Sequence, residues 1–206
     1  MPRMNMGEHT NEPAPTRWTQ STVYLDMWVD PDDDPRESDG EAVDERSILL
    51  DYLRHYRLTL EMKCAGLDAE QMAQRSVRPS TMSLLGLVRH LVEGERHFRR
   101  VMAGEDAPKL YCTDEDRDGD FNGAIADAAV VEDAWRQWRT EVELTDRYLA
   151  GVTDLGTRNA GFSDLGPDPG GDEQLRDVLV AQIAEYARHC GHADLLRERI
   201  DGRVGQ

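Results

Sequence analysis

Four stretches of the chain carry apolar residues every three or four positions, which is the spacing of one buried face of an α-helix. They span about 44–65, 80–104, 129–150 and 175–202. No comparable set of strands is predicted after residue 43. The pattern therefore predicts an all-α four-helix bundle. A glycine, typical of a helix C-terminus, ends each stretch: Gly66, Gly104, Gly151 and Gly202.

The two later links between these helices are long, at about 25 and about 22 residues, and exceed the usual turns of a bundle. A long link can run the length of the bundle and gives an up-down-down-up topology, in which the second and fourth helices are antiparallel. With Ser80 as the predicted N-cap, His90 lies about ten residues from the start of its helix, and His189 lies about ten from the end of its own. Antiparallel packing brings both to the same depth, whereas parallel packing offsets them by roughly 9 Å.

Residues 1–43 lack this periodicity and are predicted to form an N-terminal arm and acidic linker ahead of a domain at 44–206. Apolar residues alternate over 23–29, which favours a strand or an extended arm lying on the domain. Trp18 and Trp28 are its predicted anchors, because exposing large aromatic rings is costly. For the first 16 residues a disordered tail is an equal alternative.

The net charge of −17 over 206 residues argues against binding to nucleic acid or to anionic membrane surfaces. No apolar run suits a signal peptide or a membrane helix, so we expect a cytoplasmic protein, monomeric or homodimeric. The three cysteines, Cys64, Cys112 and Cys190, are too few and too widely spaced for a disulfide framework. We expect reduced thiols, with Cys190 as a small core residue.

Glu185 and His189 are the first candidates for chemistry. Four residues along a helix rotate the chain by only roughly 40°, so the carboxylate and the imidazole share a face and can hold a divalent metal. His90 borders the apolar face of the second helix and is the predicted third ligand. Gly94, one turn further on, removes bulk and leaves room for a bound molecule.

His192 competes with Glu185 as the third ligand, since it lies three residues beyond His189. Its face is rotated by about 60° from that of His189, which favours contact with a ligand residue or with substrate. Three arginines are candidates for binding an anionic cofactor or substrate, with a solvated helix face as the alternative: Arg89, Arg188 and Arg197.

The acidic loop between the second and third helices fits the first half of an EF-hand with Asp114, Asp116 and Asp118. An EF-hand needs a bidentate glutamate at its twelfth position, and Ile125 stands there. We therefore expect a solvated acidic loop and no calcium site.

Two blocks, STMSLLGLVRHL at 80–91 and EYARHCGHADLLRERIDG at 185–202, resemble the signature blocks of the DinB-like superfamily. The resemblance covers about 44–202 and is closest to its domain-of-unknown-function 664 branch, which is related to mycothiol-dependent enzymes. It implies the up-down-down-up bundle and a metal held by His90, Glu185 and His189. Many members carry histidine at the position of Glu185. The glutamate of this chain departs from that pattern, and the mycothiol-dependent maleylpyruvate isomerase relatives share it.

The resemblance implies an enzyme in which a bound divalent metal activates a mycothiol-type thiol for attack on a small electrophile, as a transferase or an isomerase. Zinc is the favoured metal, and nickel or iron also suit the ligands. No protein residue need be the nucleophile. The alternative is a metal-binding stress-response or interaction module without catalytic activity. A closed site of four protein ligands favours the module, whereas an open coordination position favours the enzyme.

Overall fold

The computed structural model describes residues 14–37, 42–160, 162–163, 166–167 and 173–206. These residues form six α-helices, one short 3-10 helix and one antiparallel pair of two-residue strands. The helices are α1 (Glu45–Cys64), α2 (Ala69–Ala73), α3 (Leu84–Ala103), α4 (Gly119–Asn122), α5 (Ala128–Gly151) and α6 (Leu175–Asp201), preceded by the 3-10 helix η1 (Pro31–Asp33), and the strands are β1 (Phe162–Ser163) and β2 (Gly166–Pro167).

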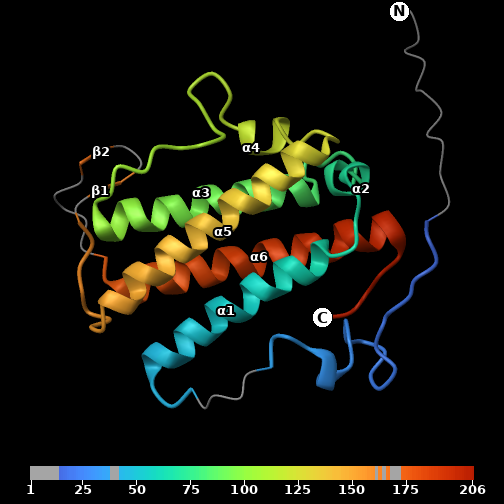
Figure 1. Cartoon of the computed structure of the whole chain (residues 1–206), viewed down its shortest axis with the longest axis horizontal. Helices are drawn as coiled ribbons and strands as arrows, with labels where there is room; N and C mark the ends of the chain where they lie inside the picture. The colour runs from blue at the N-terminus through green and yellow to red at the C-terminus, as the bar shows by residue number, and fades with distance from the viewer. Residues whose placement is uncertain (1–13, 38–41, 161, 164–165, 168–172) are drawn as a thin grey trace, which may run out of the picture.

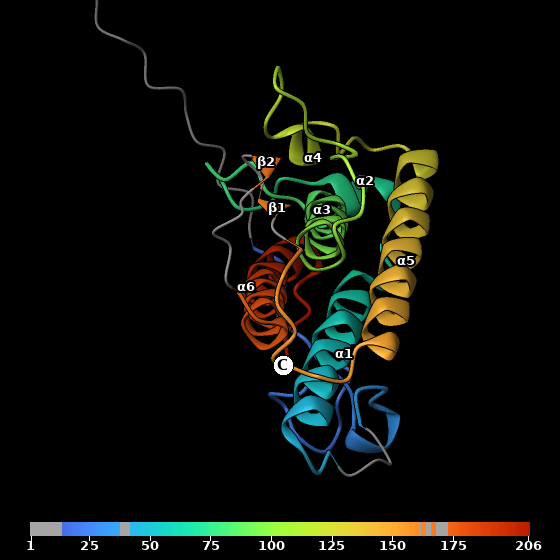
Figure 2. The same ribbon diagram turned by 90° about the vertical axis from the view of Figure 1, so that its left-hand side faces the viewer.

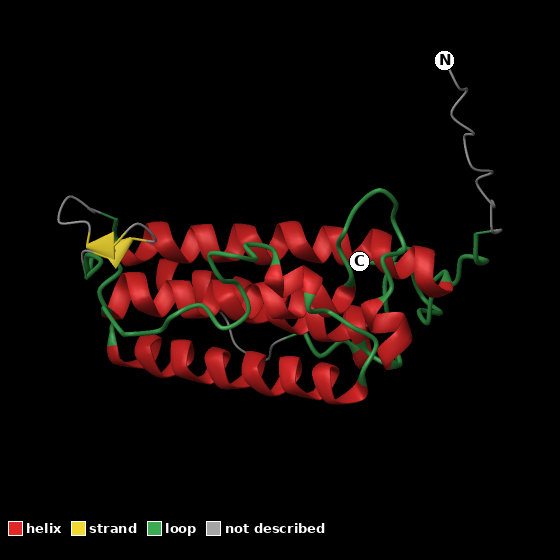
Figure 3. Cartoon of the chain, turned by 90° about the horizontal axis from the view of Figure 1, so that it is seen from above, coloured by secondary structure: helices red, strands yellow, loops and turns green. Residues whose placement is uncertain are grey.

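The strand pair corrects the expectation of no strands after residue 43. It lies in the link between α5 and α6, at one end of the molecule (Figure 3). The long helices leave it outside their core. The short helices α2 and α4 also fall in segments where the periodicity predicted links, because four or five residues are too few to establish a helical repeat.

The four long helices, α1, α3, α5 and α6, lie side by side. In Figure 1, α1 and α6 run in one direction while α3 and α5 run in the other. The α1 helix packs against α6, and α3 packs against both α5 and α6, an arrangement seen nearly end-on in Figure 2. A common apolar core takes residues from all four helices, among them Leu60, Leu87, Trp138 and Leu179.

Local capping sets where the long helices begin. Asp44 accepts a hydrogen bond from the Ser47 backbone, which starts α1 close to the predicted position. The predicted start of α3 at Ser80 was wrong. Ser83 is the N-cap instead, since its hydroxyl accepts from the backbone nitrogen of Gly86.

A buried polar chain joins the four long helices, with one residue from each. The guanidinium of Arg57 in α1 donates two hydrogen bonds, of 2.9 and 2.8 Å, to the fully buried carboxylate of Glu95 in α3. The hydroxyl of Tyr186 in α6 donates to the same carboxylate at 2.7 Å and accepts from the indole of Trp138 in α5 at 2.9 Å. Since each group depends on the next for its partner, the chain sets the relative register of the helices.

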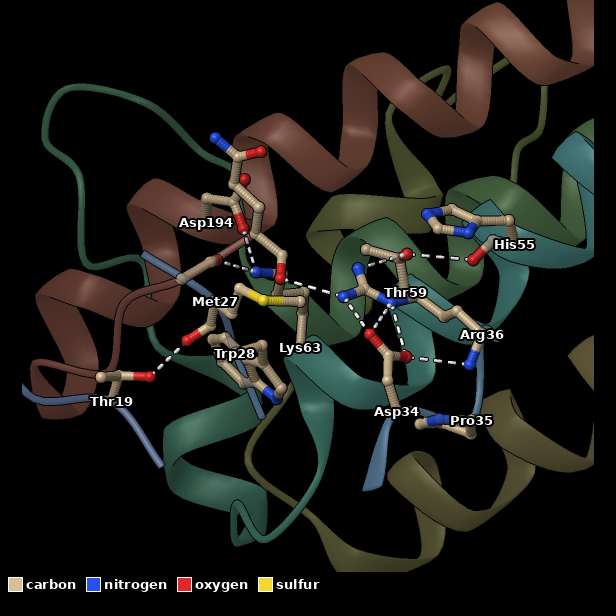
Figure 4. A network of polar contacts seen from close by, with 12 residues as sticks. Thr19, Met27, Trp28, Asp34, Pro35, Arg36, His55, Thr59, Lys63 and Asp194 are labelled. Atoms are coloured by element: carbon tan, nitrogen blue, oxygen red, sulfur yellow. Dashed lines mark hydrogen bonds and ion pairs between the residues drawn. The ribbon is translucent and has the colours of Figure 1, made fainter. Parts of the chain in front are cut away.

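The N-terminal arm packs only in part as its alternating residues predicted, because Val29 is buried in a cluster with Trp28 and Met62. Trp28 is buried beside the ammonium group of Lys63 in α1, which lies 4.1 Å from the ring centroid (Figure 4). Trp18 is 43% exposed, although its indole nitrogen donates to a backbone carbonyl at the end of α6. Val23 and Leu25, at 59% and 79% exposed, do not contribute to the core. Cation–π contacts and backbone bonds to the C-terminal segment hold the arm instead.

The arm also contacts α1 further along the chain. Arg36 pairs with Asp34 at 2.7 Å and reaches the Thr59 hydroxyl (Figure 4). The predicted tail over residues 1–13 and the part of the linker at 38–41 lie outside the described residues. Among the helices that are described, none combines the length and the apolar character needed to cross a membrane.

Candidate functional site

His90, Glu185 and His189 converge between α3 and α6. The Nε2 atoms of the two histidines lie 3.2 and 3.0 Å from the same oxygen, Oε1 of Glu185. One potential ligand atom from each residue lies within 4.8 Å of the other two. Two imidazole nitrogens and one carboxylate oxygen at this spacing form a donor set suited to a divalent metal.

The two helices contribute to this cluster in different ways. Glu185 and His189 are four residues apart on α6 and therefore share a face. His90 is the seventh residue of α3, and twelve residues of α6 follow His189. Their distances from the helix ends are therefore less equal than predicted. The rings nonetheless lie 4.7 Å apart, because α6 is the longer helix and extends past the start of α3.

Asp120, which the sequence did not single out, fixes the orientation of His90. Its carboxylate Oδ2 lies 2.7 Å from Nδ1 of His90, and Asp120 is only 3% exposed. A carboxylate beside Nδ1 favours the tautomer with the proton on that nitrogen, which leaves the Nε2 lone pair facing Glu185 and His189.

The loop around α4 carries Asp120 to this position. Phe121 stacks on the His90 ring with centroids 5.5 Å apart. A side chain at Gly86 would come within 2.6 Å of Phe121, so glycine allows α4 to approach α3 this closely. Arg89 is buried and donates to the backbone carbonyls of Gly119 and Asp120, which anchors the loop.

Charge and burial act against each other in the cluster. Burial lowers the pKa of His90, but hydrogen bonds to Asp120 and Glu185 more than offset this, so its pKa lies above the ordinary value. Burial raises the pKa of Glu185, whereas its contacts with His90 and His189 lower it to a net value below the usual range. Burial and the neighbouring His90 lower the pKa of His189. The His189 imidazole is therefore favoured in the neutral form that binds metals.

A cleft of about 400 Å³ opens beside the cluster, and His90, Gly94 and Glu185 are among its lining residues. It lies between α3 and α6, where the sequence argument expected a cavity. Its volume falls within the usual range for small-molecule sites. A larger groove of about 720 Å³ runs between α1 and α5, and none of the three clustered side chains lines it.

The other predicted site residues take different positions. Nδ1 of His192 lies 3.3 Å from Nδ1 of His189, on the side of that ring away from Glu185, and His192 is not part of the converging group. Arg188 is largely exposed and pairs with Glu185 at 3.1 Å. Arg197 is buried and donates to carbonyls at the end of α1, so both its solvated and its ligand-binding interpretations were wrong. The solvated interpretation of Arg89 was likewise wrong.

The acidic loop is only partly solvated. Asp114 and Asp118 are exposed as expected, but Asp120 is buried against His90. Periodicity could not distinguish Asp120 from its acidic neighbours, because the choice depends on how the loop folds over α3. The one available signal was the phenylalanine directly after Asp120.

None of the three cysteines lies in the converging group, and all three are free thiols. Cys190 is buried in the core as predicted. Burial raises the pKa of both Cys64 and Cys190 to about 12. Neither side chain therefore has the thiolate character of a nucleophile at neutral pH.

Comparison with known proteins adds a family to this geometry. The family described as mycothiol-S-transferase has a sequence model that matches residues 48–202. The match includes every residue of the converging group, and it confirms the relation to mycothiol-dependent enzymes predicted from the two sequence blocks. No curated protein and no solved structure matched the chain.

Proposed function

Because the chain belongs to the mycothiol S-transferase family, we propose that it is a metal-dependent transferase that joins a mycothiol-type thiol to a small electrophile. The observation that carries this proposal is the convergence of His90, Glu185 and His189 at a cleft large enough for a small ligand. Three protein donors leave a coordination position for a ligand atom. The isomerase reaction of the related enzymes is a variant of the same thiol chemistry.

The three converging residues are the proposed ligands of one divalent metal. The donor set of two nitrogens and one oxygen suits zinc best, and nickel or iron also fit it. The position of His192 behind His189 supports an orienting role for it, because a closed site of four protein ligands would need its nitrogen among the converging atoms. This geometry favours the enzyme over a module that holds metal only for structure.

The side chains prepare the site for the thiol. The hydrogen bond to Asp120 favours the proton on Nδ1 of His90, so that the electron pair on Nε2 remains free to bind a metal. A bound divalent metal would supply a lowered thiol pKa, so that the thiolate is present at neutral pH. The buried Cys64 and Cys190 leave attack on the electrophile to the thiol cofactor. Arg188 is largely exposed and pairs with Glu185, which supports the proposal that it binds an anionic group of substrate.

The finer architecture also belongs to this proposal. The directions of the four long helices support an up-down-down-up, DinB-like four-helix bundle. We assign the bundle domain to 44–206 and the arm with its acidic linker to 1–43. The net charge of −17 supports a cytoplasmic monomer or homodimer that binds neither nucleic acid nor membrane.

Metal analysis of two variants tests the ligand assignment. His189→Ala should abolish zinc binding, because it removes a converging donor. His192→Ala should largely preserve it, and serves as the matched control on the same helix. Retention of zinc in the first variant with loss in the second would show that the ligands are wrongly assigned.

Activity is then measured with the zinc-loaded protein. Mycothiol and a generic electrophile such as 1-chloro-2,4-dinitrobenzene should give a conjugate in the wild type and none above background in His189→Ala. If the wild type binds zinc but never forms conjugate with any thiol tested, the structural-module alternative replaces the enzyme.

A further inference from the structure

The cleft between α3 and α6 has a buried polar group that the proposed metal site does not use. Gln182 lies on α6, one turn before Glu185, and is 7% exposed. Its side-chain nitrogen is buried and has no hydrogen-bond partner among the described residues. Burying an amide donor without an acceptor costs folding free energy. Such a group in a cleft suggests that a ligand supplies the acceptor.

Gln182 lines the cleft, but its amide nitrogen has almost no exposed surface, so a ligand reaches it through a small movement of the side chain. Gly94 on α3 faces it, and a Cβ built at Gly94 would lie 3.8 Å from the Gln182 nitrogen. Since glycine has no side chain, the space beside the amide stays open, and both residues line the cleft. Gly94 therefore leaves room at Gln182 as well as at His90, for which the sequence argument had invoked it.

The rest of the cleft indicates what kind of molecule fits. The lining is mixed: Phe98 and Val101 are buried in its wall, and it also has charged residues, among them Glu93, Arg96 and Arg100. At the rim stands Lys109, an exposed cation that makes no ion pair with any described residue. An amide donor in a cleft with an apolar wall and several cations suits a small ligand whose acceptor oxygen carries partial or full negative charge.

We propose that Gln182 is a ligand-anchoring residue, whose amide donates to a carbonyl or carboxylate oxygen of the molecule that reacts at the His90, Glu185 and His189 cluster. This inference rests on the proposed function for the identity of that cluster. Three residues along α6 correspond to about 4.5 Å, so the acceptor oxygen lies a few covalent bonds from the reacting atom. The oxygen belongs either to the body of the thiol or to the electrophile, and both present the same chemistry to Gln182.

Nuclear magnetic resonance of the Gln182 side-chain amide tests the contact directly. The signal is assigned by its loss in Gln182→Leu, which should fold normally because it removes an unpaired donor from a buried position. The zinc-loaded protein is titrated with N-acetylcysteamine, which has both a thiol and an amide carbonyl, and with ethanethiol, which has only the thiol. Propionamide, added at saturating ethanethiol, represents an amide-bearing electrophile.

A shift with N-acetylcysteamine but not with ethanethiol places the acceptor on the thiol. A shift that requires propionamide places it on the electrophile. Either result supports the anchor. In the cobalt-substituted protein, the absorption of bound thiolate then gives dissociation constants. If the acceptor is on the thiol, Gln182→Leu should weaken N-acetylcysteamine about tenfold, which is about 1.4 kcal/mol, and leave ethanethiol unchanged. Gln137→Leu on α5, outside the cleft, should change neither.

The outcomes separate this inference from the proposed function. If cobalt spectra show thiolate at the metal while the Gln182 signal moves with no probe, the anchor is wrong and the proposed function stands. If the protein binds no metal but the signal still shifts with N-acetylcysteamine, the anchor stands and the metal-dependent function fails. If neither metal nor probe binds, both are wrong.

Discussion

Replacing Asp120 with asparagine tests how the loop around α4 serves the proposed metal site. Asparagine keeps the size of the side chain and an oxygen acceptor for the Nδ1 proton of His90, but it removes the charge. The 2.7 Å bond then changes from a charge-assisted to a neutral hydrogen bond. The backbone nitrogen of Phe121 donates to the other carboxylate oxygen and also to the carbonyl of Asp118, so it keeps a partner when the amide oxygen faces His90.

The size of the effect follows from these contacts. Hydrogen bonds to charged groups contribute about 1.5–3 kcal/mol and neutral ones about 1 kcal/mol, so the substitution should cost about 1.4 kcal/mol of metal-binding free energy, which is tenfold in affinity. Asp120 is 3% exposed, and solvent therefore cannot replace the lost charge. We expect zinc affinity to fall by about tenfold, at the lower end of the 10- to 100-fold losses seen when the partner of a metal-binding histidine is removed. Asp120→Ala should approach the upper end.

Competition with a chromogenic zinc chelator measures these affinities, and circular dichroism checks that each variant remains folded. Asp118→Asn is the matched control, since Asp118 lies in the same acidic segment but is exposed. Its zinc affinity should stay within twofold of the wild type. Equal zinc affinities for Asp120→Asn and the wild type would refute the orienting role of Asp120. An equal loss of affinity in Asp118→Asn would show that the effect comes from the overall charge of the loop.

Three further predictions concern stability. Glu95→Gln should lower the unfolding free energy by about 3 kcal/mol in urea titrations, because it leaves the buried Arg57 with only the exposed Asp146 as an anion. Glu143→Gln in an exposed pair should stay within about 0.5 kcal/mol. Similar losses for the two variants would contradict the role of burial. Trp28→Ala should lower the unfolding free energy by about 3–5 kcal/mol, and Trp18→Ala should lower it clearly less, because the two side chains are 2% and 43% exposed. A larger loss for Trp18→Ala would show that other contacts hold the arm. Hydrogen bonds from Thr22, Val23 and Ser21 lower the pKa of Asp30 from 3.8 to about 2. Its contribution to folding stability is therefore complete above about pH 4 and is lost as the pH falls toward 2. Asp30→Asn should lose this part of the pH dependence of stability, and identical acid titrations of the variant and the wild type would count against the prediction.

Local patterns in the sequence were sufficient to predict the four long helices but not the short helices α2 and α4. The long helices α1, α5 and α6 begin and end close to the predicted residues, because the apolar repeat and the terminal glycine act within a few turns of the chain. The start of α3 was missed by a few residues, since Ser80 and Ser83 are both acceptable caps and only the packed chain selects one.

The residues of the candidate cluster could also be predicted from the sequence, although the metal itself remains a proposal. Glu185 and His189 share a face because of their spacing on one helix, and His90 was predicted because it borders the apolar face of its own helix. What the sequence determined in each case was a relation between residues of one helix, or between whole helices of known direction. Such relations follow from 3.6 residues per turn and need no knowledge of loops.

Only the tertiary structure decided which polar groups meet across elements. Asp120 reaches His90 from 30 residues away because α4 folds over α3, and the acidic loop has several aspartates that local pattern cannot rank. Trp28 is buried and Trp18 is not, although both are tryptophans of the same arm. The side-chain nitrogen of Gln182 is buried without a partner among the described residues, at a point where Gly94 of another helix faces it. These contacts depend on the path of the loops and on three-dimensional packing between distant segments, which the periodicity of a single segment does not encode.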